Sequence, residues 1–62
     1  MDNRIYSVTG FDEDTQEEFA FTDRTIEEAK ELYNTLFAQE GIIGMVILEF
    51  NRIEKVFNVV EI

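Results

Sequence analysis

Cysteine, histidine, proline and tryptophan are all absent from this chain of 62 residues. Without cysteine the chain has no disulfide, no thiolate metal ligand and no thiol nucleophile. Without histidine it lacks the commonest general base and zinc ligand. Its three glycines, Gly10, Gly41 and Gly44, are isolated, so no glycine-rich loop is present to cradle a phosphate. Acid–base chemistry would have to come from paired carboxylates or the two tyrosines, for which so small a domain offers little concavity. We therefore expect a non-catalytic protein that holds no metal or cofactor.

Basic residues are also scarce. The chain carries 14 acidic residues against five basic ones, which gives a net charge of −9. The basic residues are scattered along the sequence, at Arg4, Arg24, Lys30, Arg52 and Lys55. Such a chain repels nucleic acids and anionic membrane surfaces and attracts basic partners, so we expect no direct binding to nucleic acid.

Long apolar runs are missing as well. The longest, Ile42 to Leu48, has seven residues and includes a glycine, whereas a membrane-spanning helix needs about 20. The first ten residues contain no apolar run of the kind found in signal peptides. We expect a protein of the cytoplasm, or of the host cytoplasm if the chain is viral, with no membrane association.

The apolar residues that are present predict one small folded domain over residues 1–62. Arg4 to Thr9 alternates, with Tyr6 and Val8 on one side, and Glu17 to Thr22 alternates again, with Phe19 and Phe21 pointing inward. The acidic segment 10–16 between them is typical of a turn. These two segments predict a hairpin with a long acidic loop.

A helix is predicted over residues 26–39. Apolar residues recur at helical spacing, at Ile26, Ala29, Leu32, Tyr33, Leu36 and Phe37. Thr25 and Glu28 fit a capping box at its start, and Gly41 is a suitable stop after its end.

Two more strands are predicted, from Ile42 to Phe50 and from Lys55 to Ile62. The predicted fold is α+β, a single ββαββ domain with a four-stranded, mainly antiparallel sheet and one helix packed on one face. The strand order stays open, because either the first and last strands or the third strand could lie at the centre. The apolarity of the third strand on both sides favours a central place for it.

Both faces of the last two strands are apolar, whereas a single helix can cover only one face. The third strand has Val46, Leu48 and Phe50 on the side opposite Ile43, and the fourth has Phe57 and Val59 opposite Val56. We expect one face to be an oligomer interface, formed by Ile43, Met45, Ile47, Val56, Val60 and Ile62. A homodimer or a partner protein would cover it, because a surface of this size is rare on a monomer. The alternative is that loops or the curl of the sheet cover it within the monomer.

The negative charge is concentrated between Asp12 and Glu31, where nine acids and two bases give a net charge of −7. The predicted partner-binding surface consists of eight of these acids: Asp12, Glu13, Asp14, Glu17, Glu18, Glu27, Glu28 and Glu31. Carboxylates spaced in this way can imitate a sugar-phosphate backbone and dock on a basic groove. The simpler interpretation is a solvated face that maintains solubility.

The segment from Asp12 to Asp23 bears a weak similarity to a calcium-binding EF-hand loop. The sixth position of this segment is Glu17, where an EF-hand loop needs glycine, and its twelfth position is Asp23, where the loop usually has glutamate. The predicted elements on either side of it are strands, whereas helices flank an EF-hand loop. We therefore expect a plain acidic turn here and no metal site.

In size, charge and surplus apolar surface the chain resembles the small acidic proteins that phages and mobile elements direct against host enzymes. These include DNA-mimic inhibitors of uracil-DNA glycosylase, of restriction enzymes and of CRISPR nucleases. The resemblance implies an inhibitor whose acidic surface binds a basic nucleic-acid-handling host protein. The alternative function is a structural module that forms a homo-oligomer through its apolar sheet face, with the acids serving solubility.

Overall fold

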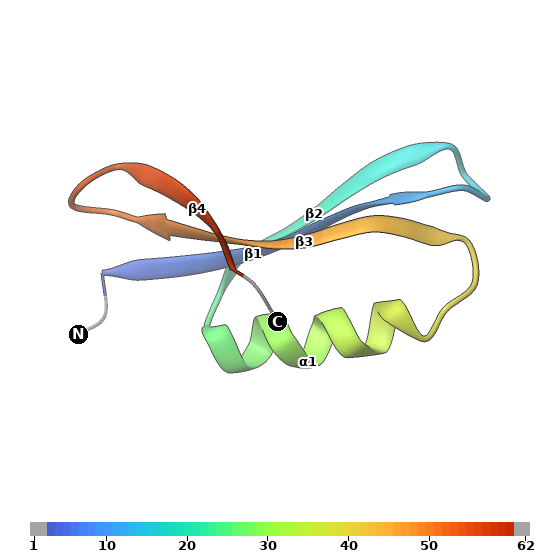
Figure 1. The fold of residues 1–62 in the computed structure, drawn as a ribbon, viewed down its shortest axis with the longest axis horizontal. Helices are drawn as coiled ribbons and strands as arrows, with labels where there is room; N and C mark the ends of the chain where they lie inside the picture. The colour runs from blue at the N-terminus through green and yellow to red at the C-terminus, as the bar shows by residue number, and fades with distance from the viewer. Residues whose placement is uncertain (1–2, 61–62) are drawn as a thin grey trace.

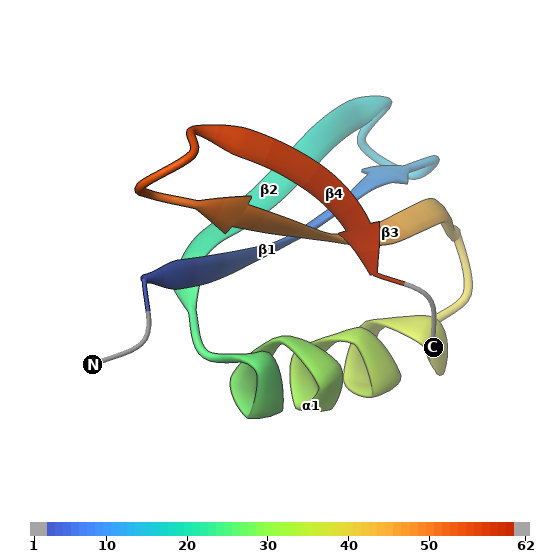
Figure 2. The ribbon, with the colours of Figure 1, turned by 60° about the vertical axis from the view of Figure 1, so that its left-hand side comes forward.

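The computed structural model describes residues 3–60 and confirms the α+β class and the ββαββ order. The elements are β1 (Arg4–Asp12), β2 (Glu17–Arg24), α1 (Ile26–Phe37), β3 (Ile42–Asn51) and β4 (Val56–Val60). The four strands form one sheet in the order β2-β1-β3-β4, and all neighbours are antiparallel. The third strand is internal, as its apolarity on both sides predicts, and α1 lies against one face of the sheet (Figures 1 and 2).

A capping box starts the helix. The Thr25 hydroxyl accepts a hydrogen bond from the Glu28 amide at 3.2 Å, and a Glu28 carboxylate oxygen accepts one from the Thr25 amide at 3.0 Å. These bonds satisfy two backbone donors, one in the first turn and one on the cap residue itself. The helix ends at Phe37, two residues before the predicted end. Gly41 lies beyond the helix cap, and its carbonyl accepts a hydrogen bond from the Glu13 amide at 2.8 Å.

The core lies between α1 and the two central strands. Tyr6 and Val8 of β1, Ala29 of α1 and Ile47 of β3 are its buried residues. The partly buried apolar side chains that pack against them are Ile26, Leu32, Tyr33, Leu36 and Val60. The alternation in β1 and the helical spacing in α1 therefore identify the core side of both elements correctly.

The hairpin between β1 and β2 is tighter than predicted. β1 continues to Asp12, so the loop comprises only residues 13–16 and not the predicted 10–16. The Asp12 carboxylate accepts a hydrogen bond from the Asp14 amide at 2.9 Å, and Gln16 adopts a φ of 60°. An aspartate that bonds the backbone two residues on stabilises such a turn. Gly10 belongs to the strand, where a Cβ atom would meet the Phe19 ring at 2.6 Å.

A bulge in β3 changes which side chains share a face. Thr9 pairs with Val46 whereas Phe11 pairs with Ile43, so β3 has one residue more than β1 over this stretch. Gly44 lies in it with a φ of 64°, a conformation that glycine adopts without steric cost. Because side chains alternate along a strand, the additional residue moves Ile43 to the face opposite Ile47.

Candidate functional site

The six residues predicted as an oligomer interface do not lie on one face, and this residue set is wrong. Ile47 is 0% exposed and packs in the core against α1. Val60 pairs with Ile47 and also packs on this core, whereas Ile43 lies on the opposite face beyond the bulge. The prediction assumed unbroken alternation through Gly44.

The remaining members of that set are also separated from Ile43. Met45 lies beside Gly10 on the helix side of the sheet, since a Cβ atom on that glycine would meet it at 2.9 Å. Val56 shares the side of Val60 within β4 but is exposed. Ile62 lies outside the described residues.

The opposite side of the sheet, which we call the open face, carries apolar side chains on β3 and β4 and is interrupted on β1 by Ser7 and Thr9. Its strand register brings together Ile5, Phe11, Ile43, Val46, Leu48, Phe50, Phe57 and Val59. Phe57 is 65% exposed and Val59 is 63% exposed, and the Phe57 ring lies 4.7 Å from that of Phe50. The sequence did contain the signal for this surface, because it places Val46, Leu48 and Phe50 on one side of the third strand.

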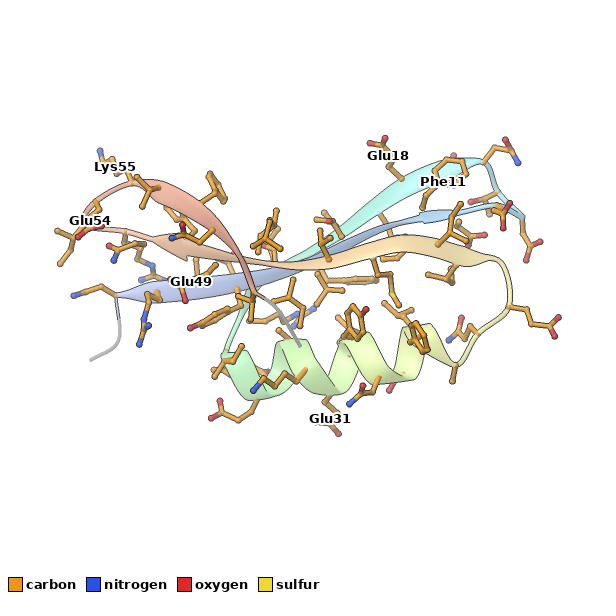
Figure 3. The ribbon with its side chains drawn as sticks, in the orientation of Figure 1. Phe11, Glu18, Glu31, Glu49, Glu54 and Lys55 are labelled. Carbon is orange, nitrogen blue, oxygen red and sulfur yellow. The ribbon has the colours of Figure 1, made fainter. Side chains whose placement is uncertain are left out.

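The predicted acidic surface divides into two groups. The first lies where the β1–β2 hairpin turns. We call this the acidic end: Asp12, Glu13, Asp14, Glu17 and Glu18, joined by Glu40 through the contact of the α1–β3 loop with the hairpin. Glu18 points away from the helix, on the side of the open face (Figure 3). All six residues except Asp12 are exposed.

The second acidic group is Glu27, Glu28 and Glu31 on the helix. Glu31 points outward from α1, on the side of the molecule opposite Glu18 (Figure 3). Glu28 has a structural role, because its hydrogen bonds with the Thr25 backbone and hydroxyl, aided by the nearby Arg24 charge, lower the pKa of its carboxyl below the ordinary 4.5. The eight acids therefore do not form one surface facing one partner.

Four of the five basic residues lie at the other end of the sheet, contrary to the scattered distribution in the sequence. The antiparallel order brings the start of β1, the ends of β2 and β3 and the β3–β4 turn together. The basic residues of this end, which we call the basic end, are Arg4, Arg24, Arg52 and Lys55. Arg4 lies 3.7 Å from the Glu49 carboxylate, which also accepts a hydrogen bond from the Tyr6 hydroxyl at 3.2 Å.

No metal-binding cluster adds to these surfaces in residues 3–60. In this part of the chain no three histidine, cysteine or acidic side chains come together as a metal site. A hollow beside β2 and α1 is lined by Phe21, Arg24, Leu32 and Thr35 together with Glu28 and Glu31. Within the same residues α1 is too short and too polar to cross a membrane.

Comparisons with known proteins supply no further assignment: no family model, curated protein or solved structure matches this chain.

Proposed function

We propose that this chain is a non-catalytic protein-binding protein, an inhibitor of the phage or mobile-element type that binds the basic nucleic-acid site of a host protein. The observation that supports the proposal is the acidic end, where six acids gather and segment 12–18 contains no basic residue. Like charges held this close destabilise a small domain, so their concentration favours a use in binding.

The acidic end suits this role better than the helix acids do. Its residues lie on a tight hairpin. A hydrogen bond from the Glu13 amide to the Gly41 carbonyl connects this hairpin to the α1–β3 loop, so the backbone that carries the carboxylates is fixed at this point. An array of negative charges on a fixed backbone attracts the basic groove of a partner protein. This binding weakens as salt screens the charges. A cytoplasmic host protein that handles DNA or RNA is the partner with this chemistry.

The experiment is an affinity capture from host lysate at low and high salt, with two matched variants. The first replaces Glu13, Glu17 and Glu18 by lysine; the second replaces Glu27 and Glu31 by lysine. Glu28 is left unchanged because it caps the helix. We expect the wild-type chain and the helix variant to recover a basic nucleic-acid-binding protein at low salt only, and the hairpin variant to recover none.

Displacement distinguishes mimicry from ordinary charge attraction. The purified partner is loaded with a labelled duplex, and the wild-type chain is titrated in. Mimicry requires release of the duplex at concentrations that saturate the partner. If the partner holds the chain and the duplex together, or if the hairpin variant binds equally well, the proposal is wrong.

A second candidate function is an assembly module, in which the acids serve solubility. The open face favours it, because Phe57 is 65% exposed and Val59 is 63% exposed on that side of the sheet.

A further inference from the structure

The strand β4 lies at one edge of the sheet and is exposed on both of its faces. It comes last in the order β2-β1-β3-β4, so none of the described segments pairs with its outer edge (Figure 2). The helix leaves it uncovered, because α1 packs against β1, β2 and β3, and no Cα atom of α1 lies within 8 Å of one in β4. Four of its five residues are exposed, and Val60 alone is partly buried. The unpaired backbone groups of such an edge can bind a further strand.

The two edges of the sheet differ in how they are protected from such pairing. The other edge strand, β2, carries four charged residues, namely Glu17, Glu18, Asp23 and Arg24. Its register also shifts against β1 between Tyr6 and Val8, where Asp23 adopts a φ of 58°. Charges and bulges on an edge strand hinder the addition of another strand. In contrast, β4 pairs with β3 in unbroken register and has no charged residue between Val56 and Val60, so it lacks both kinds of protection.

The sequence of β4 is complementary to itself when a second copy runs antiparallel. A pairing centred on Asn58 sets Val56 opposite Val60 and Phe57 opposite Val59, so only the central pair is polar. The register with β3 places Phe57 and Val59 on the open face, and Val56 and Val60 on the helix side. Apolar cross-strand pairs of this kind stabilise an antiparallel ladder. They also cover side chains that the single chain leaves exposed.

The charges that flank β4 in the sequence fit the same register. Lys55 precedes the strand and Glu61 follows it, and each is three residues away from Asn58. An antiparallel pair centred on Asn58 therefore brings the lysine of each copy opposite the glutamate of the other, at both ends of the ladder. Opposite charges that face each other across a ladder stabilise it, whereas like charges destabilise it.

We infer that β4 pairs antiparallel with β4 of a second copy, about a two-fold axis that passes through Asn58 perpendicular to the sheet. The two four-stranded sheets then join edge to edge, with both helices on the same side. The helices leave room for each other, because neither lies against β4. The assembly closes at two copies, since the edges that remain are the charged β2 strands. The inference does not depend on the proposed function, because the acidic end lies outside this contact.

The first test is sedimentation equilibrium over a concentration series, with the full chain and two variants of equal charge. Asn58→Lys places two lysines opposite each other on the two-fold axis, and Asn34→Lys adds the same charge at an exposed position of the helix. Each variant changes the net charge from −9 to −8, so relief of overall repulsion alone predicts stronger dimers for both. The proposed pairing predicts that only Asn58→Lys dimerises more weakly, by about fivefold.

Two properties make this comparison practical. Asn58 faces Glu49 of β3, so a lysine at this position is compatible with the fold of the single chain, which circular dichroism checks. The contact between five-residue strands is small, so we expect the wild-type chain to dimerise at hundreds of micromolar and to dissociate on dilution to about 10 µM.

Exchange of the flanking charges tests the register. Lys55→Glu brings two glutamates together at each end of the ladder, and Glu61→Lys brings two lysines together. We expect each single variant to dimerise about threefold more weakly, even though Glu61→Lys changes the net charge from −9 to −7. The double variant restores both opposite-charge pairs and keeps the net charge of −9, so it should dimerise like the wild-type chain.

Amide hydrogen exchange distinguishes edge pairing from packing through the open face. In an antiparallel ladder, alternate residues of a strand direct their N–H groups to the same neighbour. We therefore expect alternate amides of β4 to exchange rapidly in dilute solution and to become protected at hundreds of micromolar. The outward amides of β2 should stay unprotected at both concentrations.

Three results overturn the inference. The first is a wild-type chain that stays monomeric at millimolar concentration. The second is a dimer that Asn58→Lys strengthens as much as Asn34→Lys does, or one that forms without protecting the amides of β4, because another surface then joins the copies. The third is a double variant at Lys55 and Glu61 that dimerises no better than the single variants, which rules out the register centred on Asn58.

Discussion

Glu28 contributes an exposed negative charge and also stabilises the start of the helix. Its carboxylate accepts a hydrogen bond from the Thr25 amide, and its own amide donates to the Thr25 hydroxyl. Both bonds were predictable from the spacing of Thr25 and Glu28, because a capping box requires this pair three residues apart. The predicted binding role of Glu28 is separate from this and stays a prediction.

The capping box predicts a specific pH dependence. Folding lowers the pKa of the Glu28 carboxyl, so its contribution to stability is present above the ordinary pKa of 4.5 and is lost as the pH falls through the lowered value. Glu28→Gln keeps a neutral acceptor and removes this titration. We expect Glu28→Gln to lower Tm at pH 7, and the difference from the wild-type chain to shrink toward zero in acid. Glu27→Gln, one residue earlier, is the control; a difference for Glu28→Gln that is equal at both pH values would contradict the assignment.

At the scale of elements, the strand β3 shows where the sequence pattern suffices and where it fails. The alternation correctly predicts a strand with two apolar sides and a central place in the sheet. The alternation does not show the bulge at Gly44, because both sides of the strand are apolar; the signal in the sequence is the isolated glycine itself. The predicted interface therefore mixed Ile43 of the open face with Ile47 of the core.

Two matched isoleucines test this assignment of faces. Ile47 is fully buried and Ile43 is 49% exposed, and both lie in β3. We expect Ile47→Ala to lower the free energy of unfolding by about 2 to 5 kcal/mol, the usual cost of truncating a large core side chain. Ile43→Ala removes the same atoms from a half-exposed site and is expected to cost about 1 kcal/mol.

Urea denaturation measures both values, through the midpoint at unchanged slope. The measurement is made at a protein concentration low enough that self-association does not contribute to stability. Equal losses in the two variants would contradict the placement of Ile43 on the open face.

For the molecule as a whole, the topology rearranges the charge in a way that the sequence does not show. The acidic segment near Asp12 was recognisable because its residues are consecutive. Arg4 and Arg24 are far in the chain from Arg52 and Lys55, and only the antiparallel order of four strands gathers them at one end. Strand order was open at the level of sequence, so the polarity of the molecule could not be predicted.

The surplus of negative charge predicts that salt stabilises this protein. Charges interact across about 30 Å at 0.01 M salt and about 8 Å at 0.15 M, and the molecule is 37 Å long. Added salt therefore screens repulsion among the six residues of the acidic end, whereas the 3.7 Å ion pair of the half-exposed Arg4 with Glu49 contributes little to stability. We expect Tm to rise between these two salt concentrations. A gain of about 1 kcal/mol in the free energy of unfolding corresponds to a rise in Tm of about 4–8 °C in a domain of this size.

Thermal unfolding followed by circular dichroism at a fixed, low protein concentration measures this effect. Replacing Glu13, Glu17 and Glu18 by glutamine should reduce the rise. Replacing Glu27 and Glu31 should reduce it less, because the helix group has three acids and the acidic end has six. Screening is nearly complete once the Debye length falls below the spacing between charges. The rise should therefore level off by about 0.3 M sodium chloride. A Tm that falls as salt is added would contradict this prediction. It would show that attraction between the acidic end and the basic end outweighs the repulsion among the carboxylates of the acidic end.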